Sequence, residues 1–558
     1  MNSGEYTCFE VFAVSEKGKR GNVRLKAESG DTQTEKAGKN YYAWLRFTLQ
    51  KDTDYEIILE DAKVSYCYLS GCDDILDRGI RFVEIGRVGE SGIHPAAVMS
   101  KNDTAVHYDT CYREQYHFVP WKNWINDPNG LCWYQGRYHM FYQMNPHGQE
   151  WSNMYWGHAA SRDLVHWIHL PMVLGPQEEI LERPGEIKGG AFSGCAVPFD
   201  DKVVFYLTRH LGPMEDGPET IQEQWMSESR DMLHFEEEKL IIQNKPEGAS
   251  FDFRDPKVTK VGDTWYMVLA SALNGKAAIL LYASADMEHW EYRNPLLVEE
   301  ENGIRCFECP DFFEADGKYA ALGAWMSHYD EQKRFQMSRY YIGDFVDEKL
   351  QVEHSGWLDF GSNFYAMQSF EHDGRRISIG WVNDPYGEHI EAENGAYGSM
   401  TIPREIHIKN NRLYMTPVSE IYSLKGEQIY KGEKPAVLGD IQGNSYYASV
   451  KFSKDTDFTI LLGEDGDKRI ILQKEGEKTS IRTTNVKSEG IDFRADVGEV
   501  KELEIFVDRR VVEIYINRGE AVGTKVFYNS SKKGCFTMTA REEAAVEMVE
   551  VTQMQSIW

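Results

Sequence analysis

Apolar and polar positions alternate over short runs along most of this chain, and turn residues separate the runs. Between about residues 115 and 420, a polar turn leading into an apolar strand recurs five times, at 136–142, 201–206, 262–266, 317–322 and 374–379. The spacing is roughly sixty residues, a size typical of a repeat of four short antiparallel strands. The pattern therefore predicts a five-bladed β-propeller.

A second repeated motif has the same kind of spacing. The pattern Ser-x-Asp-x-x-His-aromatic occurs at 161–167, 229–235 and 284–290, with starts 68 and 55 residues apart. Ser and Asp side chains bond to nearby backbone N–H groups in turns, and an aromatic ring can pack between blades. We interpret the repeated Asp and His as parts of the scaffold and not as catalytic groups.

The regions on either side of the repeat are also rich in strands but lack the period. Runs such as 504–508 and 511–517 predict an antiparallel β-sandwich after the propeller, and 55–59 indicates strands before it. We expect an all-β chain with three domains. They are a small β-rich N-terminal domain of unknown role (1–110), a five-bladed β-propeller catalytic domain (111–425) and a C-terminal β-sandwich (426–558).

Composition excludes several classes of protein. The 558 residues include 61 basic and 89 acidic ones, a formal charge of −28 that repels nucleic acid and acidic membrane surfaces. The sequence shows no apolar run long enough to span a membrane and no leader-like start, and its nine cysteines are an odd number spread along the chain. We expect a cytoplasmic protein with no nucleic-acid or membrane partner, able to form homo-oligomers through its N- or C-terminal domain.

Three carboxyl groups stand out against the repeat. Asp127 and Asp255 each precede a proline in strand-like sequence, and Glu308 lies in a short apolar segment that also ends in proline. A proline fixes φ, which suits a neighbouring side chain that has to be aimed. Asp127, Ser193, Asp255, Glu308 and Tyr365 are 66, 62, 53 and 57 residues apart. We expect them at equivalent positions of the five blades, gathered at one mouth of the propeller axis.

Such a group of acids suits the hydrolysis of a glycosidic bond. Two carboxyls about 5 to 5.5 Å apart achieve it with retention, one as nucleophile and one as acid and then base. We assign Asp127 as nucleophile and Glu308 as acid/base, because the apolar neighbours of Glu308 favour its neutral form. Arg254 should keep Asp255 ionised as a stabiliser of the transition state. The acids form no close set of metal ligands, so we expect no metal and no cofactor.

Sugar recognition also requires aromatic faces and amides around the acids. The candidates for substrate binding are Asn126, Gln143, Trp151, Phe192, Ser193, Arg254, Tyr365 and Trp381. Any single aromatic residue could instead belong to the core. Asn126 and Gln143 are favoured because they are amides beside a catalytic segment or within an apolar one.

The segments around these residues resemble, in order, the motifs of glycoside hydrolase family 32, which comprises invertases, inulinases, levanases and fructosyltransferases. The segments are 124–130, 141–146, 151 with 156–159, 192–194, 253–256, 308–311 and 364–366, and 506–508 with 512–513 resembles the family's sandwich. The resemblance implies a retaining enzyme with Asp127 as nucleophile, Asp255 as transition-state stabiliser and Glu308 as acid/base. Ile125 departs from the more common Met, and a domain such as 1–110 is not usual in the family.

We therefore expect a β-fructofuranosidase-type glycoside hydrolase acting on a small fructose-containing saccharide. It should cleave terminal β-D-fructofuranosyl residues from sucrose, its phosphate or short fructo-oligosaccharides through a covalent fructosyl-enzyme intermediate. Two alternatives stay open. One is a fructosyltransferase with the same intermediate, including one that forms an intramolecular difructose anhydride. The other is a propeller that binds sugars without cleaving them.

Overall fold

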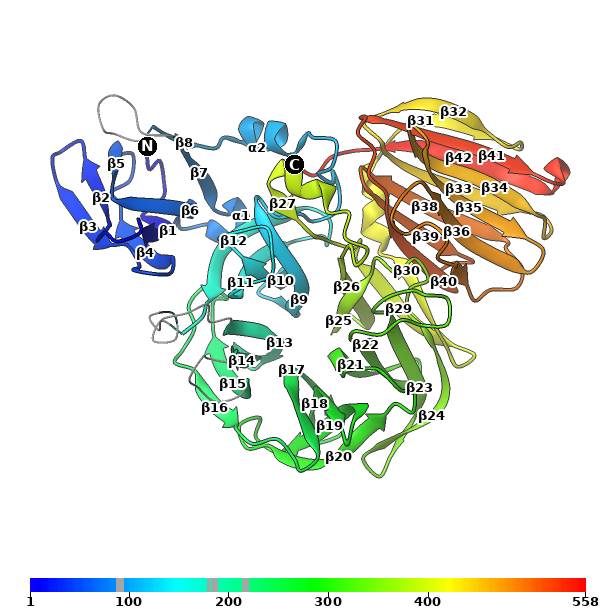
Figure 1. Cartoon of the computed structure of the whole chain (residues 1–558), viewed down its shortest axis with the longest axis horizontal. Coiled ribbons are helices and arrows are strands. Elements are labelled where there is room, and N and C mark those ends of the chain that lie inside the picture. The colour runs from blue at the N-terminus through cyan, green and yellow to red at the C-terminus, as the bar shows by residue number, and fades with distance from the viewer. Residues whose placement is uncertain (87–94, 178–180, 182–188, 213–219) are drawn as a thin grey trace.

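The computed structural model describes residues 1–86, 95–177, 181, 189–212 and 220–558. A ring of five antiparallel sheets forms its centre (Figure 1), and within each sheet the main strands follow one another in chain order. The five-bladed propeller that the sequence period predicts is confirmed. A β-sandwich follows it and further sheets precede it, as expected.

The blades are built as follows. Blade 1 contains β9 (Asn123–Tyr134), β10 (Arg137–Asn145), β11 (Tyr155–Ser161) and β12 (Trp167–Leu174). Blade 2 contains β13 (Gly189–Phe199), β14 (Lys202–Leu211), β15 (Ile221–Ser229) and β16 (Lys239–Ile242). Blade 3 contains β17 (Ala249–Val261), β18 (Thr264–Leu273), β19 (Lys276–Ser284) and β20 (Glu291–Val298). Blade 4 contains β21 (Phe307–Ala315), β22 (Lys318–Trp325), β23 (Ser338–Val346) and β24 (Lys349–Trp357). Blade 5 contains β25 (Tyr365–His372), β26 (Arg375–Val382), β29 (Arg404–Lys409) and β30 (Arg412–Pro417).

The innermost strand of each blade faces the middle of the ring. These strands are β9, β13, β17, β21 and β25, and each contacts the innermost strands of both neighbouring blades. The ring closes through β27 (Ala396–Tyr397), which leaves blade 5 and pairs in parallel with β9, while β28 (Ser399–Met400) pairs with β26. Apolar side chains fill the space between neighbouring blades, so strands such as β11 and β19 are buried along almost their whole length.

The repeated Ser-x-Asp-x-x-His motif forms the same turn three times. Asp163, Asp231 and Asp286 each accept backbone N–H groups two and three residues later and also bond to the imidazole that follows. The indoles of Trp167 and Trp290 donate to carbonyls of the same turns. These local contacts confirm that the motif belongs to the scaffold.

Two six-stranded sheets pack face to face at the C-terminal end. The first contains β31 (Lys425–Gly432), β42 (Val546–Met554), β33 (Ser445–Phe452), β38 (Glu502–Asp508), β39 (Val511–Ile516) and β40 (Ala521–Val526). The second contains β32 (Val437–Gln442), β41 (Lys533–Ala540), β34 (Phe458–Asp465), β35 (Lys468–Glu475), β36 (Lys478–Thr484) and β37 (Phe493–Ala495). Short 3-10 helices lie at Ile390–Asn394, Ser419–Leu424 and Glu543–Ala545.

Buried charges join the propeller to the sandwich. The imidazole of His117 lies 2.8 Å from an oxygen of Asp508 and 3.1 Å from one of Glu513. Arg404 donates to Glu513 at 2.9 Å, and Asp508 also accepts three backbone N–H groups from residues 115–117. We call His117, Arg404, Asp508 and Glu513 the seam cluster. It ties segments almost 400 residues apart.

The N-terminal residues form two sheets. One contains β4 (Ala43–Thr48), β1 (Cys8–Ser15), β6 (Ala62–Ser70), β7 (Arg81–Ile85) and β8 (Ala96–Val98). The other contains β3 (Thr32–Lys36), β2 (Asn22–Ala27) and β5 (Tyr55–Glu60). Two helices, α1 (Ile75–Arg78) and α2 (Lys101–Tyr108), follow β6 and β8. No helix within the described ranges has both the length and the apolar character needed to cross a membrane.

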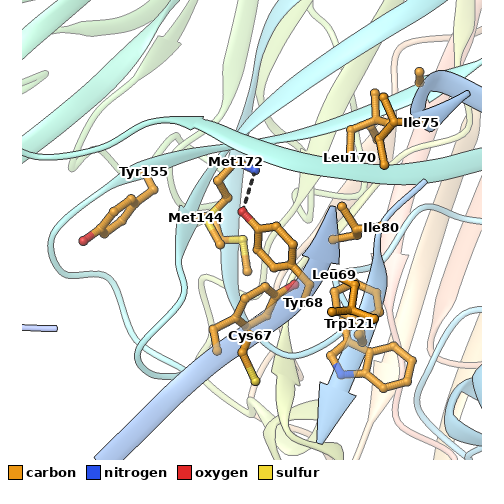
Figure 2. Packing of buried hydrophobic residues seen from close by; sticks show 14 of the residues in the cluster. Cys67, Tyr68, Leu69, Ile75, Ile80, Trp121, Met144, Tyr155, Leu170 and Met172 are labelled. Atoms are coloured by element: carbon orange, nitrogen blue, oxygen red, sulfur yellow. Dashed lines mark hydrogen bonds between the residues drawn. The ribbon is translucent and has the colours of Figure 1, made fainter. Parts of the chain in front are cut away.

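The N-terminal sheets share a hydrophobic core with blade 1. Figure 2 shows Tyr68 of β6 beside Met144 and Met172 of blade 1, with Leu69 near Trp121. The Tyr68 hydroxyl accepts the backbone N–H of Met172 at 3.2 Å. The N-terminal sheets are therefore docked through a continuous apolar contact and not hung on a linker.

Candidate active site

Each innermost strand contains a β-bulge at the same place. In all five blades, two consecutive paired residues are three positions apart on the innermost strand but two positions apart on the neighbouring strand. The residues left between consecutive pairs are Asn126 and Asp127, Phe192 and Ser193, Asp255 and Pro256, Cys309 and Pro310, and Ala366 and Met367. A bulge bends its strand and re-aims its side chains. The repeated bulge therefore explains how five segments far apart in sequence supply one site.

The three acids occupy different steps of this shared bulge. Glu308 is the last paired residue before its bulge, Asp255 is the first unpaired residue and Asp127 is the second. The expectation of strictly equivalent positions is therefore wrong, although the segments do correspond. Because of the offset, the three carboxyls enter from three blades without repeating one position of a five-fold ring.

Asp127 lies among three hydrogen-bond donors. Its Oδ2 accepts the Ser193 hydroxyl at 2.6 Å and the Cys309 thiol at 3.2 Å, and its Oδ1 accepts the Asn126 amide at 3.1 Å. Burial raises the pKa of Asp127, the Ser193 hydrogen bond opposes this rise, and the charge of Glu308 adds to it. The donors fix the orientation of the carboxylate, as a nucleophile requires.

Asp255 is held by the backbone of blade 4. The Cys309 N–H donates to its Oδ2 at 2.9 Å, and its own N–H donates to the Thr208 hydroxyl at 3.0 Å. Burial raises the pKa of Asp255 to about 7, Arg254 opposes this, and the charges of Asp127 and Glu308 add to it. The expectation that Arg254 keeps Asp255 ionised is wrong, because burial outweighs a guanidinium whose nearest nitrogen is 3.8 Å away.

Glu308 instead receives the guanidinium. Arg254 donates to its Oε1 at 2.8 Å, and the Tyr365 hydroxyl donates to its Oε2. The expected apolar surrounding of Glu308 is wrong, because successive residues of a strand face opposite sides. Phe307 accordingly packs in the core between blades 3 and 4, while Glu308 faces the pocket.

One residue connects the three acids. Cys309 donates its thiol to Asp127 and its N–H to Asp255, and it directly follows Glu308. Both Asp255 and Cys309 hold positive φ, at 60° and 46°, which costs an L-residue about 1–3 kcal/mol each. Ala366 has the same conformation at 54°, so the first unpaired residue of the bulge has positive φ in blades 3, 4 and 5.

The three acids line a single pocket of about 390 Å³. Its walls contain all the residues that the sequence proposes for substrate binding, namely Asn126, Gln143, Trp151, Phe192, Ser193, Arg254, Tyr365 and Trp381. A cavity of about 450 Å³ between the propeller and the sandwich is larger, but none of the three acids lines it. The sequence-predicted residues therefore lie together at the site of the carboxyls.

Several lining residues escaped the sequence analysis. They are His210, Thr220, Gln222, Phe251, Asp252, Arg305, Met326 and Gln336. One of them had a readable signal: Asp252 lies two residues before Arg254 on the same strand face, and the two form an ion pair. The others come from strands β14, β15 and β17 or from loops, where no motif marks them.

Aromatic rings frame the pocket. Trp124 stacks on Tyr397 with ring centroids 4.2 Å apart and donates its indole N–H to Asn126 at 2.7 Å. Phe192 stacks on His210 at 4.1 Å. Trp151 meets Phe192 edge to face at 5.9 Å. Rigid apolar faces beside oriented amides and carboxyls are what a sugar ring requires.

Comparisons with known proteins agree with this geometry. Two family models match, Glycosyl hydrolases family 32 N-terminal domain over residues 117–417 and Glycosyl hydrolases family 32 C terminal over residues 420–555. A sucrose-6-phosphate hydrolase of Escherichia coli is 33% identical over 454 residues, which cover 77% of this chain and 92% of that protein.

Solved structures show the same architecture. That of a glycoside hydrolase family 32 protein from Bifidobacterium adolescentis has a TM-score of 0.90 at 32% identity and covers 100% of this chain and 99% of that one. A mutant of the Bombyx mori GH32 beta-fructofuranosidase in complex with sucrose has a TM-score of 0.71 at 27% identity and covers 82% of this chain and 97% of that one. Residues 1–116 lie outside both family models.

Proposed function

The chain belongs to glycoside hydrolase family 32 and is a glycoside hydrolase, and we propose that it releases terminal β-D-fructofuranosyl residues from sucrose or short fructo-oligosaccharides with retention of configuration. The observation that carries the proposal is the single pocket in which Cys309 links Asp127 to Asp255 beside Glu308. Membership of a hydrolase family also sets aside a propeller that only binds sugars.

The proposed reaction has two steps. Asp127 attacks the anomeric carbon while Glu308 gives its proton to the departing oxygen, and a fructosyl ester forms on Asp127. Glu308 then takes a proton from water, which opens the ester. Asp255 bonds to fructose hydroxyls as positive charge develops on the ring, and the donors around Asp127 keep its reacting oxygen in place.

The leaving group should lie on the Glu308 side of the pocket, because the acid must reach the glycosidic oxygen. Arg305 lines this side, since the Asp252 carboxylate that holds it at 2.9 Å also holds Arg254 beside Glu308. The Arg305 guanidinium lies 4.9 Å from the centre of the Phe251 ring, which is 42% exposed. A flat apolar face beside hydrogen-bond donors suits a neutral sugar ring.

The charges of the pocket favour an unphosphorylated substrate. Among the described residues that line the pocket, two are arginines and none is a lysine, whereas four carry carboxyls. The arginines are Arg254 and Arg305, and the acids are Asp127, Asp252, Asp255 and Glu308. Both guanidiniums are already paired with carboxylates. A phosphate carries about −1.5 to −2 charges and needs cations of its own. We therefore expect kcat/KM for sucrose to exceed that for sucrose 6-phosphate by about 10-fold or more, and the reverse order would overturn this assignment.

Trapping the intermediate tests the mechanism. Glu308→Gln should accept fructose from fructosyl fluoride, whose leaving group needs no acid, and should then hydrolyse the ester slowly. Mass spectrometry of digested protein should find one fructosyl unit on the peptide that contains Asp127, and none in the Glu308→Gln, Asp127→Asn double variant. A label on Asp255, or no label with inverted product, would contradict the proposal.

Product analysis distinguishes hydrolysis from transfer, since both share the ester. The wild type incubated with sucrose, 1-kestose and levanbiose at low and high concentration should yield mainly free fructose. Newly linked saccharides as the main product would assign the chain to the fructosyltransferases of the family instead.

A further inference from the structure

The N-terminal sheets reach one loop of the propeller directly. His147, two residues past β10, stacks on Tyr42 with ring centroids 4.5 Å apart and an angle of 15° between the planes. Its Nδ1 lies 2.8 Å from the Ser65 hydroxyl, and Phe12 packs edge to face against it at 5.5 Å. Three side chains from residues 1–110 thus hold one imidazole of blade 1.

The same imidazole also bonds to its own blade. Its Nε2 lies 3.3 Å from the Tyr155 hydroxyl at the start of β11. Burial lowers the pKa of His147 to about 3, so the ring is neutral and offers one donor and one acceptor. Ser65 and Tyr155 take these two places, and the orientation of the ring is fixed from both sides.

His147 lies in the loop of residues 146–154, which carries Trp151 into the pocket wall. The loop has little regular structure, and its backbone is held at a few points. The Asn145 side chain accepts the His147 N–H at 3.0 Å and donates to the Glu150 carbonyl at 2.8 Å. The backbone N–H of Trp124, which also lines the pocket, donates to the Gly148 carbonyl at 3.0 Å. Movement of His147 would therefore be passed on to Trp151 through a short, bonded segment.

Trp151 is sensitive to such movement. Its side chain is 37% exposed, and it meets Phe192 edge to face. A wall residue that is not buried in a core depends on its loop for its position.

We propose that Tyr42, Ser65 and Phe12 act as positioning residues for Trp151 through His147, so that the N-terminal sheets set one wall of the saccharide pocket. This inference rests on the proposed function. It gives residues 1–110 a role in substrate binding, although they lie outside the range that the family models match.

Removing the stacked ring tests the inference. Tyr42→Ala in the full-length chain should raise KM for sucrose and 1-kestose about 3–10-fold, the range expected for one aromatic contact, and leave kcat within about twofold. Tyr42→Phe keeps the ring and should match the wild type. Ser65→Ala removes one hydrogen bond and should raise KM about 2–3-fold, which keeps the test available if Tyr42→Ala does not fold.

A double-mutant cycle with Trp151 tests whether Tyr42→Ala raises KM through the position of Trp151. Trp151→Ala should raise KM at least as much as Tyr42→Ala, and the double variant should be no worse than Trp151→Ala alone. If Tyr42→Ala raises KM by the same factor in both backgrounds, or if Trp151→Ala leaves KM unchanged, the inference is overturned.

A matched control separates positioning from loss of stability. Tyr68→Phe weakens the same docked core at Met172, on the outer strand of blade 1, and should lower Tm without changing KM. A rise in KM for Tyr68→Phe would mean that any damage to the core acts on the pocket. No release of fructose by the wild type would instead overturn the proposed function, so the two failures can be told apart.

Discussion

Buried charges occur at both the seam cluster and the active-site pocket, but they are balanced differently. In the seam, burial opposes charge, yet Arg404 and His117 hold the pKa of Glu513 down to about 2. Burial likewise opposes the charge of His117, but the hydrogen bonds that its imidazole donates to Asp508 and Glu513 raise its pKa to about 9. In the pocket, burial wins, and it raises the pKa of Asp127 and of Asp255.

The difference teaches what each cluster is for. A buried carboxyl surrounded by cations and donors is held charged and fixes the relative position of two domains. Buried carboxyls that outnumber their cations repel one another, and in the pocket this repulsion adds to burial in raising the pKa of Asp255 to about 7. The two kinds of cluster differ by degree. Asp359 pairs with Arg404 of the seam cluster, and burial nevertheless raises its pKa.

The largest contrast should come from the nucleophile. Asp127→Asn should lower kcat by about 10⁴-fold or more, equivalent to about 5.5 kcal/mol of barrier, because the ester cannot form. The free energy of unfolding should stay equal or rise, since a buried carboxyl with a raised pKa is removed. Steady-state kinetics and urea titration measure the two effects. A loss of stability with retained activity would place Asp127 in the scaffold.

The seam should respond in the opposite way. Glu513→Ala leaves His117 and Arg404 buried without their shared carboxylate and should cost about 3–5 kcal/mol of unfolding free energy, with kcat/KM unchanged below the transition. Glu542→Ala is a matched control on the same sandwich, because its ion pair with Lys454 is exposed and should be worth less than about 1 kcal/mol. Equal costs for the two variants would remove the distinction between buried and exposed pairs here.

Asp255 should make the free energy of unfolding depend on pH, because its pKa is raised in the folded state. The native state keeps its proton up to about pH 7, whereas the unfolded chain loses it near pH 4, so this group makes stability fall as pH rises through that interval. Asp255→Asn stays neutral and should gain little at pH 4.5 but about 2–4 kcal/mol at pH 8 relative to the wild type. Denaturant midpoints at the two pH values provide the measurement. A gain that does not change with pH would show that Asp255 is not a buried, protonated carboxyl.

Much of the site could be predicted because repetition converts sequence spacing into spatial proximity. The period places Asp127, Asp255 and Glu308 in inner strands, and inner strands converge on one axis. The charge partners could not be predicted in the same way. Adjacency suggested that Arg254 serves Asp255, but a long side chain reaches past its neighbour, and Arg254 bonds to Glu308 on the next blade.

The contacts of the N-terminal sheets with His147, in the loop that carries Trp151, had no signal in the sequence. Tyr42 and Ser65 meet His147 only because the N-terminal sheets dock on blade 1 across about a hundred residues of chain. Composition and strand patterns describe such a region as β-rich and say nothing about where it packs. Contacts between separately patterned regions are therefore the part of the site that the sequence leaves undetermined.

The smallest expected effect concerns Cys309, which donates its thiol to Asp127 and its backbone N–H to Asp255. Burial raises the pKa of its thiol well above the usual range, so it is a neutral donor to the Asp127 carboxylate and not a second nucleophile. Cys309→Ala should lower kcat about 3–10-fold by removing that hydrogen bond, with the acids still aligned because the backbone N–H to Asp255 is kept.

Cys309→Ser provides the matched comparison. A hydroxyl is a stronger donor than a thiol but shorter, so it should recover part of the lost kcat if hydrogen bonding to Asp127 is what the thiol supplies. If Ser is as poor as Ala, or if KM changes instead of kcat, the thiol acts by filling space between blades. In that case Ser193 and Asn126 would be the donors that orient Asp127, and fewer hydrogen bonds would offset the repulsion among the pocket's carboxyls.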